Sequence, residues 1–261
     1  MSTSVVWITG ASSGIGEALV YEFAKSGYQA IISSRKKESL ERVKSKTVDP
    51  NNIFVLPLDL SDSGNFDEIA AQAIAAFGHV DILINNGGIS QRSLAVDTKL
   101  EVDRKIMEVN YFGSIALSKA ILPHFIARKN GHFGVISSLV GKFGSPYRSS
   151  YAGAKHALHG FFDSLRAENF RENIKVTMIC PGFIKTNVSI NALTGDGSPL
   201  NEMDDAQNKG MSPEACAKAI RKGMESHKLE ILVGGKETMA VYLKRWFPGV
   251  FAKLIQKAKV R

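Results

Sequence analysis

The sequence predicts an α/β fold: a doubly wound sheet of about seven parallel strands with helices on both faces. Short apolar runs rich in β-branched residues recur seven times, separated by longer stretches with helical spacing. The runs do not alternate apolar with polar residues, which is typical of parallel strands covered on both faces. The chain has 261 residues, of which 44% are hydrophobic, so we expect a single domain over residues 1–261 with a well-filled core.

The seven expected strands are spread along the whole chain. They are VVWIT (5–9), AIISS (30–34), IFVLPLD (53–59), DILINN (81–86), FGVISS (133–138), KVTMIC (175–180) and EILVGG (230–235). The first helix is expected directly after the first strand, because Ile15, Leu19 and Phe23 recur every four residues. Gly27 can end this helix in the left-handed conformation.

A glycine-rich turn links the first strand to the first helix. In ITGASSGIGEAL, Gly10, Gly14 and Gly16 would let the backbone approach a pyrophosphate, which the helix N-terminus attracts. Ser12 and Ser13 add hydroxyl donors. A purely structural turn would also use such glycines, but the position between an apolar strand and an amphipathic helix favours dinucleotide binding.

The end of the second strand predicts which dinucleotide binds. NAD-binding units place an acidic residue about 20 positions after the glycines, to bond the ribose hydroxyls. Here Arg35 stands 19 residues after Gly16, flanked by Ser34, Lys36 and Lys37. A guanidinium and a hydroxyl can bind a 2′-phosphate, so we predict NADP(H). The alternative is a solvated start of the next helix.

A tyrosine and a lysine one helical turn apart form the candidate catalytic group. We expect Tyr151 and Lys155 on one face of a helix that Ser149 or Ser150 caps. A nearby ammonium favours the phenolate and lowers the pKa of a phenol toward working pH. Ser138, at the end of the fifth strand, could reach the same substrate oxygen. The alternative is an ordinary exposed helix face.

Together these motifs resemble the short-chain dehydrogenase/reductase family over essentially the full length. The pattern G-x-x-x-G-x-G and Y-x-x-x-K, with a serine 13 residues before the tyrosine, is joined by LDL (58–60), NNGG (85–88), the asparagine of MEVNYFGSIAL and PGFIKT (181–186). The tail and the segment GFIKTNVSINALTGDGS resemble the subgroup that contains acyl/alkyl-dihydroxyacetone-phosphate reductase and steroid- or retinoid-type reductases. Gly87 departs from the family, where alanine is usual.

The resemblance implies a Rossmann-like oxidoreductase and a role for each matching residue. Tyr151 would be the general acid/base, Lys155 would lower its pKa and bond the nicotinamide ribose, Ser138 would hold the substrate oxygen, and Asn110 would support a proton-relay water. The residues implied to bind the cofactor are Gly10, Ser12, Ser13, Gly14, Ile15, Gly16, Ser34, Arg35, Lys36, Asp59, Leu60, Asn86, Gly87, Tyr151, Lys155, Ile184 and Thr186.

Two further segments are expected to determine substrate specificity. Residues 182–211 leave the carboxyl end of the sixth strand and are rich in Gly, Asn, Asp and Ser, which predicts a substrate loop, with a plain flexible loop as the alternative. We expect its Asp204 and Asp205 to be solvated. The tail at 240–261 mixes aromatic and basic residues, with Pro248 interrupting any continuous helix. It could touch a membrane surface weakly or cover the substrate cleft or a neighbouring subunit.

The remaining features limit the function classes. Cys180 and Cys216 form no C-x-x-C, and His156 and His159 have no evident third ligand, so no metal site is expected. The net charge of +8 favours anionic ligands, but no aromatic-basic motif supports nucleic acid. No signal or spanning stretch is visible, and we expect a cytoplasmic protein. The resemblance suggests a homodimer or homotetramer, with helices around residues 100–128 and the catalytic helix between subunits. The alternative is that these apolar helix faces meet only their own sheet.

The sequence therefore predicts an NADP(H)-dependent oxidoreductase that interconverts an alcohol and a ketone or aldehyde, with an apolar or lipid-like substrate. The alternatives are a non-catalytic NADPH-binding regulator and a peripheral membrane-binding protein. The complete set of Ser138, Tyr151 and Lys155 argues against a regulator, which has no need of it.

Overall fold

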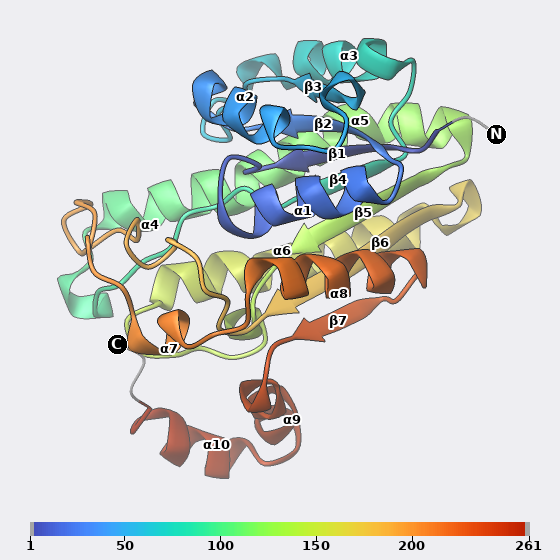
Figure 1. Cartoon of the computed structure of the whole chain (residues 1–261). Helices are drawn as coiled ribbons and strands as arrows, with labels where there is room; N and C mark the ends of the chain where they lie inside the picture. The colour runs from blue at the N-terminus through green and yellow to red at the C-terminus, as the bar shows by residue number, and fades with distance from the viewer. Residues whose placement is uncertain (1–2, 259–261) are drawn as a thin grey trace.

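The computed structural model describes residues 3–258 and confirms the predicted parallel sheet (Figure 1). The strands pair in the order β3-β2-β1-β4-β5-β6-β7. They are β1 (Val5–Thr9), β2 (Gln29–Ser33), β3 (Ile53–Val55), β4 (Ile82–Asn85), β5 (Gly131–Ile136), β6 (Ile174–Pro181) and β7 (Glu230–Val233). The strand β3 ends at Val55, earlier than expected, although the amides of Leu56 and Leu58 still donate to the carbonyl oxygens of Ile32 and Ser34 at 3.0 Å.

Helices cover both faces of this sheet (Figure 1). The helices of the described residues are α1 (Gly14–Lys25), α2 (Lys37–Ser45), α3 (Phe66–Phe77), α4 (Leu100–Met107), α5 (Gly113–Arg128), α6 (Ser149–Glu168), α7 (Asp205–Asn208), α8 (Pro213–Glu225), α9 (Met239–Trp246) and α10 (Pro248–Ile255). As predicted, Gly27 follows α1 with a positive φ of 85°.

Successive side chains of a strand point to opposite faces of the sheet, where they pack into two separate apolar cores. In β1, Val5 and Trp7 pack with the side chains of α3, α5 and α6 on one face. Val6 and Ile8 pack with the side chains of α1, α2 and α8 on the other. All four side chains are fully buried, which explains why the strands read as continuous apolar runs.

The order of the sheet creates a crevice at the carboxyl end of β1. The chain runs from β1 outward through β2 to β3 and then returns to the opposite side of β1 with β4. The connections after β1 and β4 therefore diverge to opposite faces of the sheet. Open α/β sheets bind their ligands at such a point.

A π-helical turn joins α4 to α5 and carries Asn110. This turn covers Glu108–Phe112 and makes residues 100–128 one continuous helical segment. Gly113, at its end, packs against the backbone of Leu60, where a Cβ would lie 2.2 Å from the Leu60 carbonyl oxygen. The absence of a side chain at Gly113 thus sets how closely this helix approaches the segment after β3.

The last two helices form a hairpin set apart from the sheet (Figure 1). Pro248 is the first residue of α10, which confirms that it interrupts the helix of the tail. Phe251 anchors the hairpin, since it is 6% exposed and its ring lies 5.0 Å from that of Phe143.

We expect the Phe133→Ala variant to lose about 3–5 kcal/mol of unfolding free energy, because it opens a cavity in a close-packed core. Phe133 is fully buried, with ring centroids of Phe125 and Phe162 at 5.1 and 6.0 Å. Urea unfolding followed by circular dichroism measures the loss. Phe170→Ala is the control, since Phe170 is 68% exposed, and it should change stability by no more than about 0.5 kcal/mol. Equal losses in both variants would contradict the assigned core.

Candidate active site

Backbone geometry explains each of the three glycines after β1. Gly10 and Gly14 have positive φ values of 63° and 57°, which other residues rarely adopt. A Cβ on Gly16 would lie 2.2 Å from the carbonyl oxygen of Gly10, so α1 can start only where Gly16 has no side chain. The turn thereby presents the N-terminal amides of α1 at the crevice.

Residues from two other connections surround this turn. The Asn86 amide donates to the carbonyl oxygens of Thr9 and Gly10 at 2.8 and 3.2 Å, which fixes the turn against the end of β4. Thr186 lies on the other side, where a Cβ on Gly14 would come within 3.1 Å of its methyl carbon. The structure thus brings the predicted residues of the chain segments after β1, β4 and β6 together.

Gly87, the departure from the family pattern, has a local packing reason. A Cβ at this position would lie 2.5 Å from Cδ1 of Leu60, so an alanine would require the leucine to move. Leu60 itself is buried, whereas Asp59 is exposed and accepts hydrogen bonds from the amide and hydroxyl of Ser61 at 2.9 and 2.8 Å.

The end of β2 carries a buried serine hydroxyl and two exposed basic side chains. The Ser34 hydroxyl oxygen is buried and has no hydrogen-bond partner within residues 3–258. Arg35 and Lys36 are exposed beside it. Sequence reasoning missed Arg42, whose guanidinium donates to the Ser12 carbonyl oxygen at 2.8 Å and pairs with Glu17 at 2.7 Å. It braces the glycine turn, and no motif in the sequence indicated it.

The structure brings Ser138, Tyr151 and Lys155 together at the carboxyl end of β5. Lys155 is buried, its Nζ lies 5.7 Å from the centroid of the Tyr151 ring, and it donates to the Ile136 carbonyl oxygen at 2.7 Å. Both reactive groups therefore sit on the face of α6 that meets the sheet, not on an exposed helix face.

Burial dominates the ionisation of both side chains. It raises the pKa of the Tyr151 phenol, while the Arg92 and Arg148 guanidinium groups and a hydrogen bond with Ser138 lower it in part. The prediction that the phenol is acidified overall is therefore wrong for the protein alone, since desolvation outweighs the nearby charges. Burial also lowers the pKa of Lys155 to about 8.

Asn110 is fixed by two hydrogen bonds to one residue. Its Oδ1 accepts from the Ile89 amide and its Nδ2 donates to the Ile89 carbonyl oxygen, both at 2.8 Å. Gly88, the residue before Ile89, lies close to both Asn110 and Lys155. A Cβ at this position would be 2.8 Å from Asn110 Oδ1 and 3.7 Å from Lys155 Nζ. Asn110 thus holds the segment after β4 against the buried lysine.

The start of α6 differs from the prediction. Its N-cap residue is Arg148, so neither Ser149 nor Ser150 caps the helix. Instead, Gln91 reaches over from the segment after β4, and its Oε1 accepts from the amides of Ser150 and Tyr151 at 3.0 and 3.4 Å. A capping group 59 residues away in the chain leaves no local signal in the sequence.

The segment 182–211 folds over this edge of the sheet. Gln207, on the short helix α7, donates to the carbonyl oxygen of Ile184 and lies 3.4 Å from the Thr186 hydroxyl. The expectation that Asp204 is solvated is wrong: it is 4% exposed and pairs with Arg92 at 2.6 Å and Arg148 at 3.3 Å. Two buried guanidinium groups compensate the desolvated carboxylate. Asp205 is exposed as expected.

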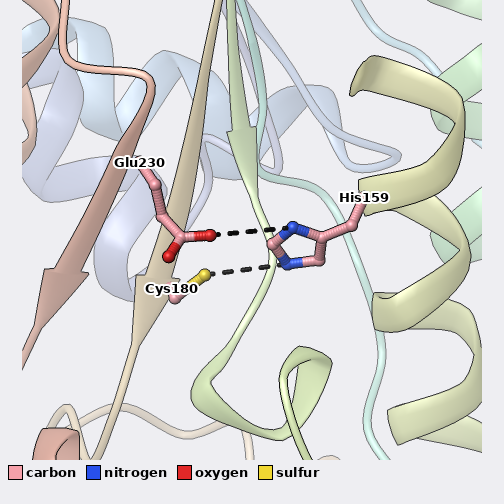
Figure 2. A group of neighbouring side chains, drawn as sticks. All are labelled: His159, Cys180 and Glu230. Atoms are coloured by element: carbon pink, nitrogen blue, oxygen red, sulfur yellow. Dashed lines mark hydrogen bonds and ion pairs between the residues drawn. The ribbon is translucent and has the colours of Figure 1, made fainter. Parts of the chain in front are cut away.

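His159, Cys180 and Glu230 form a cluster of three side chains that could each offer a ligand atom to a metal ion (Figure 2). Cys180 Sγ lies 3.7 Å from Nε2 of the imidazole, and Glu230 Oε2 lies 4.0 Å from Nδ1. The two partners use opposite ring nitrogens, and Lys142 already pairs with the carboxylate at 2.6 Å. Burial lowers the pKa of His159 to about 4 and raises that of Cys180 to about 12, so both are neutral. The cluster ties α6 to β6 and β7.

The C-terminal hairpin leaves an apolar groove open. A hollow of about 510 Å³ lies between α9 and α10, lined among others by Trp246 and Phe247, which are 72% and 60% exposed. Lys259 and Arg261 of the predicted tail lie outside the described residues. Within residues 3–258, no helix is long and apolar enough to cross a membrane.

Comparison with known proteins agrees with this geometry. The family model described as short chain dehydrogenase matches residues 4–196. The chain is 43% identical to the Dehydrogenase/reductase SDR family protein 7-like of Drosophila melanogaster, over 98% of this chain and 81% of that protein. It is 41% identical to Dehydrogenase/reductase SDR family member 7B of Mus musculus, with the same coverage.

A solved structure extends the agreement to the fold. The short-chain dehydrogenase from Streptomyces avermitilis superposes with a TM-score of 0.83 at 28% identity, covering 98% of this chain and 96% of that one. The glycine turn, the parallel sheet and the full-length similarity lead to one conclusion: the chain belongs to the short-chain dehydrogenase family of nucleotide-binding oxidoreductases.

Proposed function

We propose that this oxidoreductase uses NADP(H) to interconvert an alcohol and a ketone or aldehyde, with an apolar or lipid-like substrate. The observation that carries the proposal is the convergence of Ser138, Tyr151 and Lys155 beside the glycine turn at the sheet's carboxyl edge.

The residues present fit a phosphorylated dinucleotide. The turn at Gly10 and Gly14 has the positive φ values that bring the start of α1 to the crevice, where a pyrophosphate would meet its amides, and the buried Ser34 hydroxyl lacks a partner within residues 3–258 that a phosphate oxygen would supply. Arg35 and Lys36 are exposed beside that hydroxyl and would neutralise a 2′-phosphate. Asp59, Leu60, Asn86 and Thr186 would line the remaining length of the cofactor. When bound, the nicotinamide supplies hydride transfer.

The chain's own residues would supply the proton and orient the oxygen. Ser138 and Tyr151 would both bond the substrate oxygen. The Tyr151 hydroxyl would donate its proton in reduction, and the Tyr151 phenolate would accept a proton in oxidation. The ammonium of Lys155 would stabilise the phenolate left after donation, while Asn110 keeps the segment around Gly88 against that ammonium.

The Tyr151→Phe variant is expected to lose turnover by about 100-fold or more, because general acid–base catalysis contributes about that much. The assay follows NADPH absorbance with a panel of ketones and aldehydes, and NADP⁺ reduction with the matching alcohols. NADPH binding, measured by fluorescence titration, should be unchanged.

Tyr242→Phe removes a hydroxyl from an exposed tyrosine of α9, so it is the matched control and should retain activity. Undiminished turnover in Tyr151→Phe would refute the assigned acid/base. A wild-type protein that binds NADPH but turns over no member of the panel would favour the regulator.

The Arg35→Asp variant should bind NADPH about tenfold or more weakly, because it replaces a charge-assisted hydrogen bond with repulsion. NADH affinity should be unchanged or higher. Fluorescence titrations of both cofactors measure the ratio, and Lys46→Asp makes the same charge change at an exposed position beyond α2. If both variants alter the ratio equally, Arg35 does not select the phosphate.

We also propose that the C-terminal hairpin contacts anionic membrane surfaces. Tyr242, Trp246, Phe247, Val250 and Leu254 are each more than half exposed. The basic residues of α9 and α10 and the turn after them are exposed, and residues 239–258 contain no acidic residue. This surface would repel a second copy of itself and be attracted to anionic lipid.

Sedimentation with vesicles tests this contact. The protein should bind phosphatidylcholine vesicles that contain phosphatidylserine more strongly than pure phosphatidylcholine. The Lys253→Gln/Lys257→Gln variant should bind about 30-fold more weakly, since each basic residue near the surface contributes about 1 kcal/mol.

Trp246→Ser should also weaken binding, whereas Phe170→Ser, at an equally exposed phenylalanine elsewhere, should not. Equal binding to both vesicle types would exclude the electrostatic contact. A concentration-dependent dimer that Trp246→Ser dissolves would show instead that a second copy covers the groove.

A further inference from the structure

A glutamine from a distant segment holds the first turn of the helix that carries the proposed acid/base. Gln91 follows β4, and its Oε1 accepts from the amides of Ser150 and Tyr151 at 3.0 and 3.4 Å. The glutamine is fully buried. One of the two amides is that of Tyr151 itself, so the side chain of Gln91 acts directly on the backbone of the proposed acid/base.

The N-cap position of α6 has the wrong chemistry to bind these amides. The first amides of a helix find no acceptor within the helix and need one from elsewhere. The N-cap residue is Arg148, and a guanidinium contains hydrogen-bond donors only. The Ser150 hydroxyl donates to the Asp103 carboxylate. Gln91 therefore takes the place that an N-cap serine or aspartate often occupies.

Hydroxyl groups on the far side of the Gln91 amide fix which of its two polar atoms faces α6. Nε2 lies 2.9 Å from Thr98 Oγ1 and 3.2 Å from Ser93 Oγ. The Thr98 hydroxyl donates its single hydrogen to the carbonyl oxygen of Leu94 at 2.7 Å, so toward Gln91 it can only accept. Gln91 must therefore present its NH₂ group to Thr98 and its oxygen to the helix.

Backbone hydrogen bonds fix the chain on both sides of this glutamine. The carbonyl oxygen of Ser90 accepts from the Leu193 amide, and the Arg92 amide donates to the Leu193 carbonyl oxygen, both at 2.8 Å. The Ser93 amide donates to the carbonyl oxygen of Tyr147, just before α6, at 3.2 Å. The glutamine side chain thus starts from a backbone that is itself held by the segment after β6 and by the approach to α6.

The two ends of the one-turn spacing between Tyr151 and Lys155 are held by different segments. The Lys155 Nζ donates to the Ile136 carbonyl oxygen of β5 at 2.7 Å, whereas the Tyr151 backbone is held by Gln91. A displacement of about 1 Å at a reacting group can lower a rate by about 100-fold. A lost contact at Gln91 would therefore act on the phenol while leaving the ammonium bound to β5.

We infer that Gln91 is a positioning residue, which fixes the first turn of α6 so that the Tyr151 hydroxyl meets the substrate oxygen. The inference rests on the proposed role of Tyr151. It adds to that proposal a residue that acts only through the Tyr151 backbone.

Gln91→Met tests the inference because it keeps the length of the side chain and removes both polar atoms. With a carbonyl compound that the wild type reduces, kcat per NADPH-binding site should fall about 10- to 100-fold. KM should be unchanged, because the loss falls on the transition state and not on substrate binding. Fluorescence titration counts the NADPH sites, and the NADPH affinity should also be unchanged.

Two variants of Thr98 test the same contact without altering Gln91 or α6. Thr98→Val removes the hydroxyl that accepts from Nε2, and it should lower kcat by about three- to tenfold, since one hydrogen bond that orients the amide is lost. Thr98→Ser keeps a hydroxyl and should retain the wild-type kcat. This pair also decides the matter if Gln91→Met does not fold.

Ser212→Ala is the matched control for a lost helix cap elsewhere. The Ser212 hydroxyl accepts from the Ala215 amide at 3.2 Å at the start of α8. Its loss should lower the midpoint of urea unfolding and leave kcat per NADPH site unchanged. A role of Gln91 in stability alone would give Gln91→Met this same signature.

Unchanged kcat per site in folded Gln91→Met would overturn the inference, and so would a loss seen only as weaker NADPH binding or a higher KM. If Gln91→Met does not fold, unchanged kcat in Thr98→Val, or equal losses in Thr98→Val and Thr98→Ser, would overturn it. In each case Tyr151→Phe can still be inactive, and the proposed function then stands. A wild type that reduces no carbonyl compound would remove the proposed function and the role of Gln91 with it.

Discussion

The parallel pairing of β1 with β4 is the constraint on which the site depends. Val6, Trp7 and Ile8 align with Ile82, Leu83 and Ile84, so the two strands end side by side. The chain leaves them toward opposite faces of the sheet, and the space between the two exits receives the glycine turn and the segment after β4. Asn86 bonds the glycine turn, and Gly88 lies next to the lysine of α6. A change in this pairing would displace the proposed dinucleotide-binding residues and the proposed proton-transfer residues together.

Burial sets the ionisation of the two side chains of α6 that we propose to be catalytic. A phenol and an ammonium packed against the sheet are both pushed toward their neutral forms, since desolvation raises the pKa of Tyr151 and lowers that of Lys155. The fold opposes this tendency with charges and dipoles that are fixed before any ligand arrives. They come from Arg92 after β4 and Arg148 before α6, the Ser138 hydroxyl and the carbonyl of Ile136. Preorganised groups of this kind need no rearrangement during a reaction.

Local patterns in the sequence predicted the parts of the site that local chemistry determines. The seven strands, the glycine turn and the one-turn spacing of Tyr151 and Lys155 depend on neighbours in the chain, and the structure contains them all. The cap of α6 by Gln91, the burial of Asp204 and the contact of Arg42 with the glycine turn depend on segments 30 to 112 residues apart. A charged residue in a polar loop looks solvated until its partner is known, which is why Asp204 was misjudged.

The π-helical turn at Glu108–Phe112 limits how the chain can vary in length. One side of that turn is fixed by Asn110 on Ile89 and the other by Gly113 on the backbone of Leu60. Removing a single amino acid between these anchors would rotate everything beyond it by about 100° about the helix axis, given 3.6 residues per turn. Relatives that keep both anchors must therefore tolerate insertions and deletions elsewhere, for example where α5 gives way to the exposed Lys129 and Asn130.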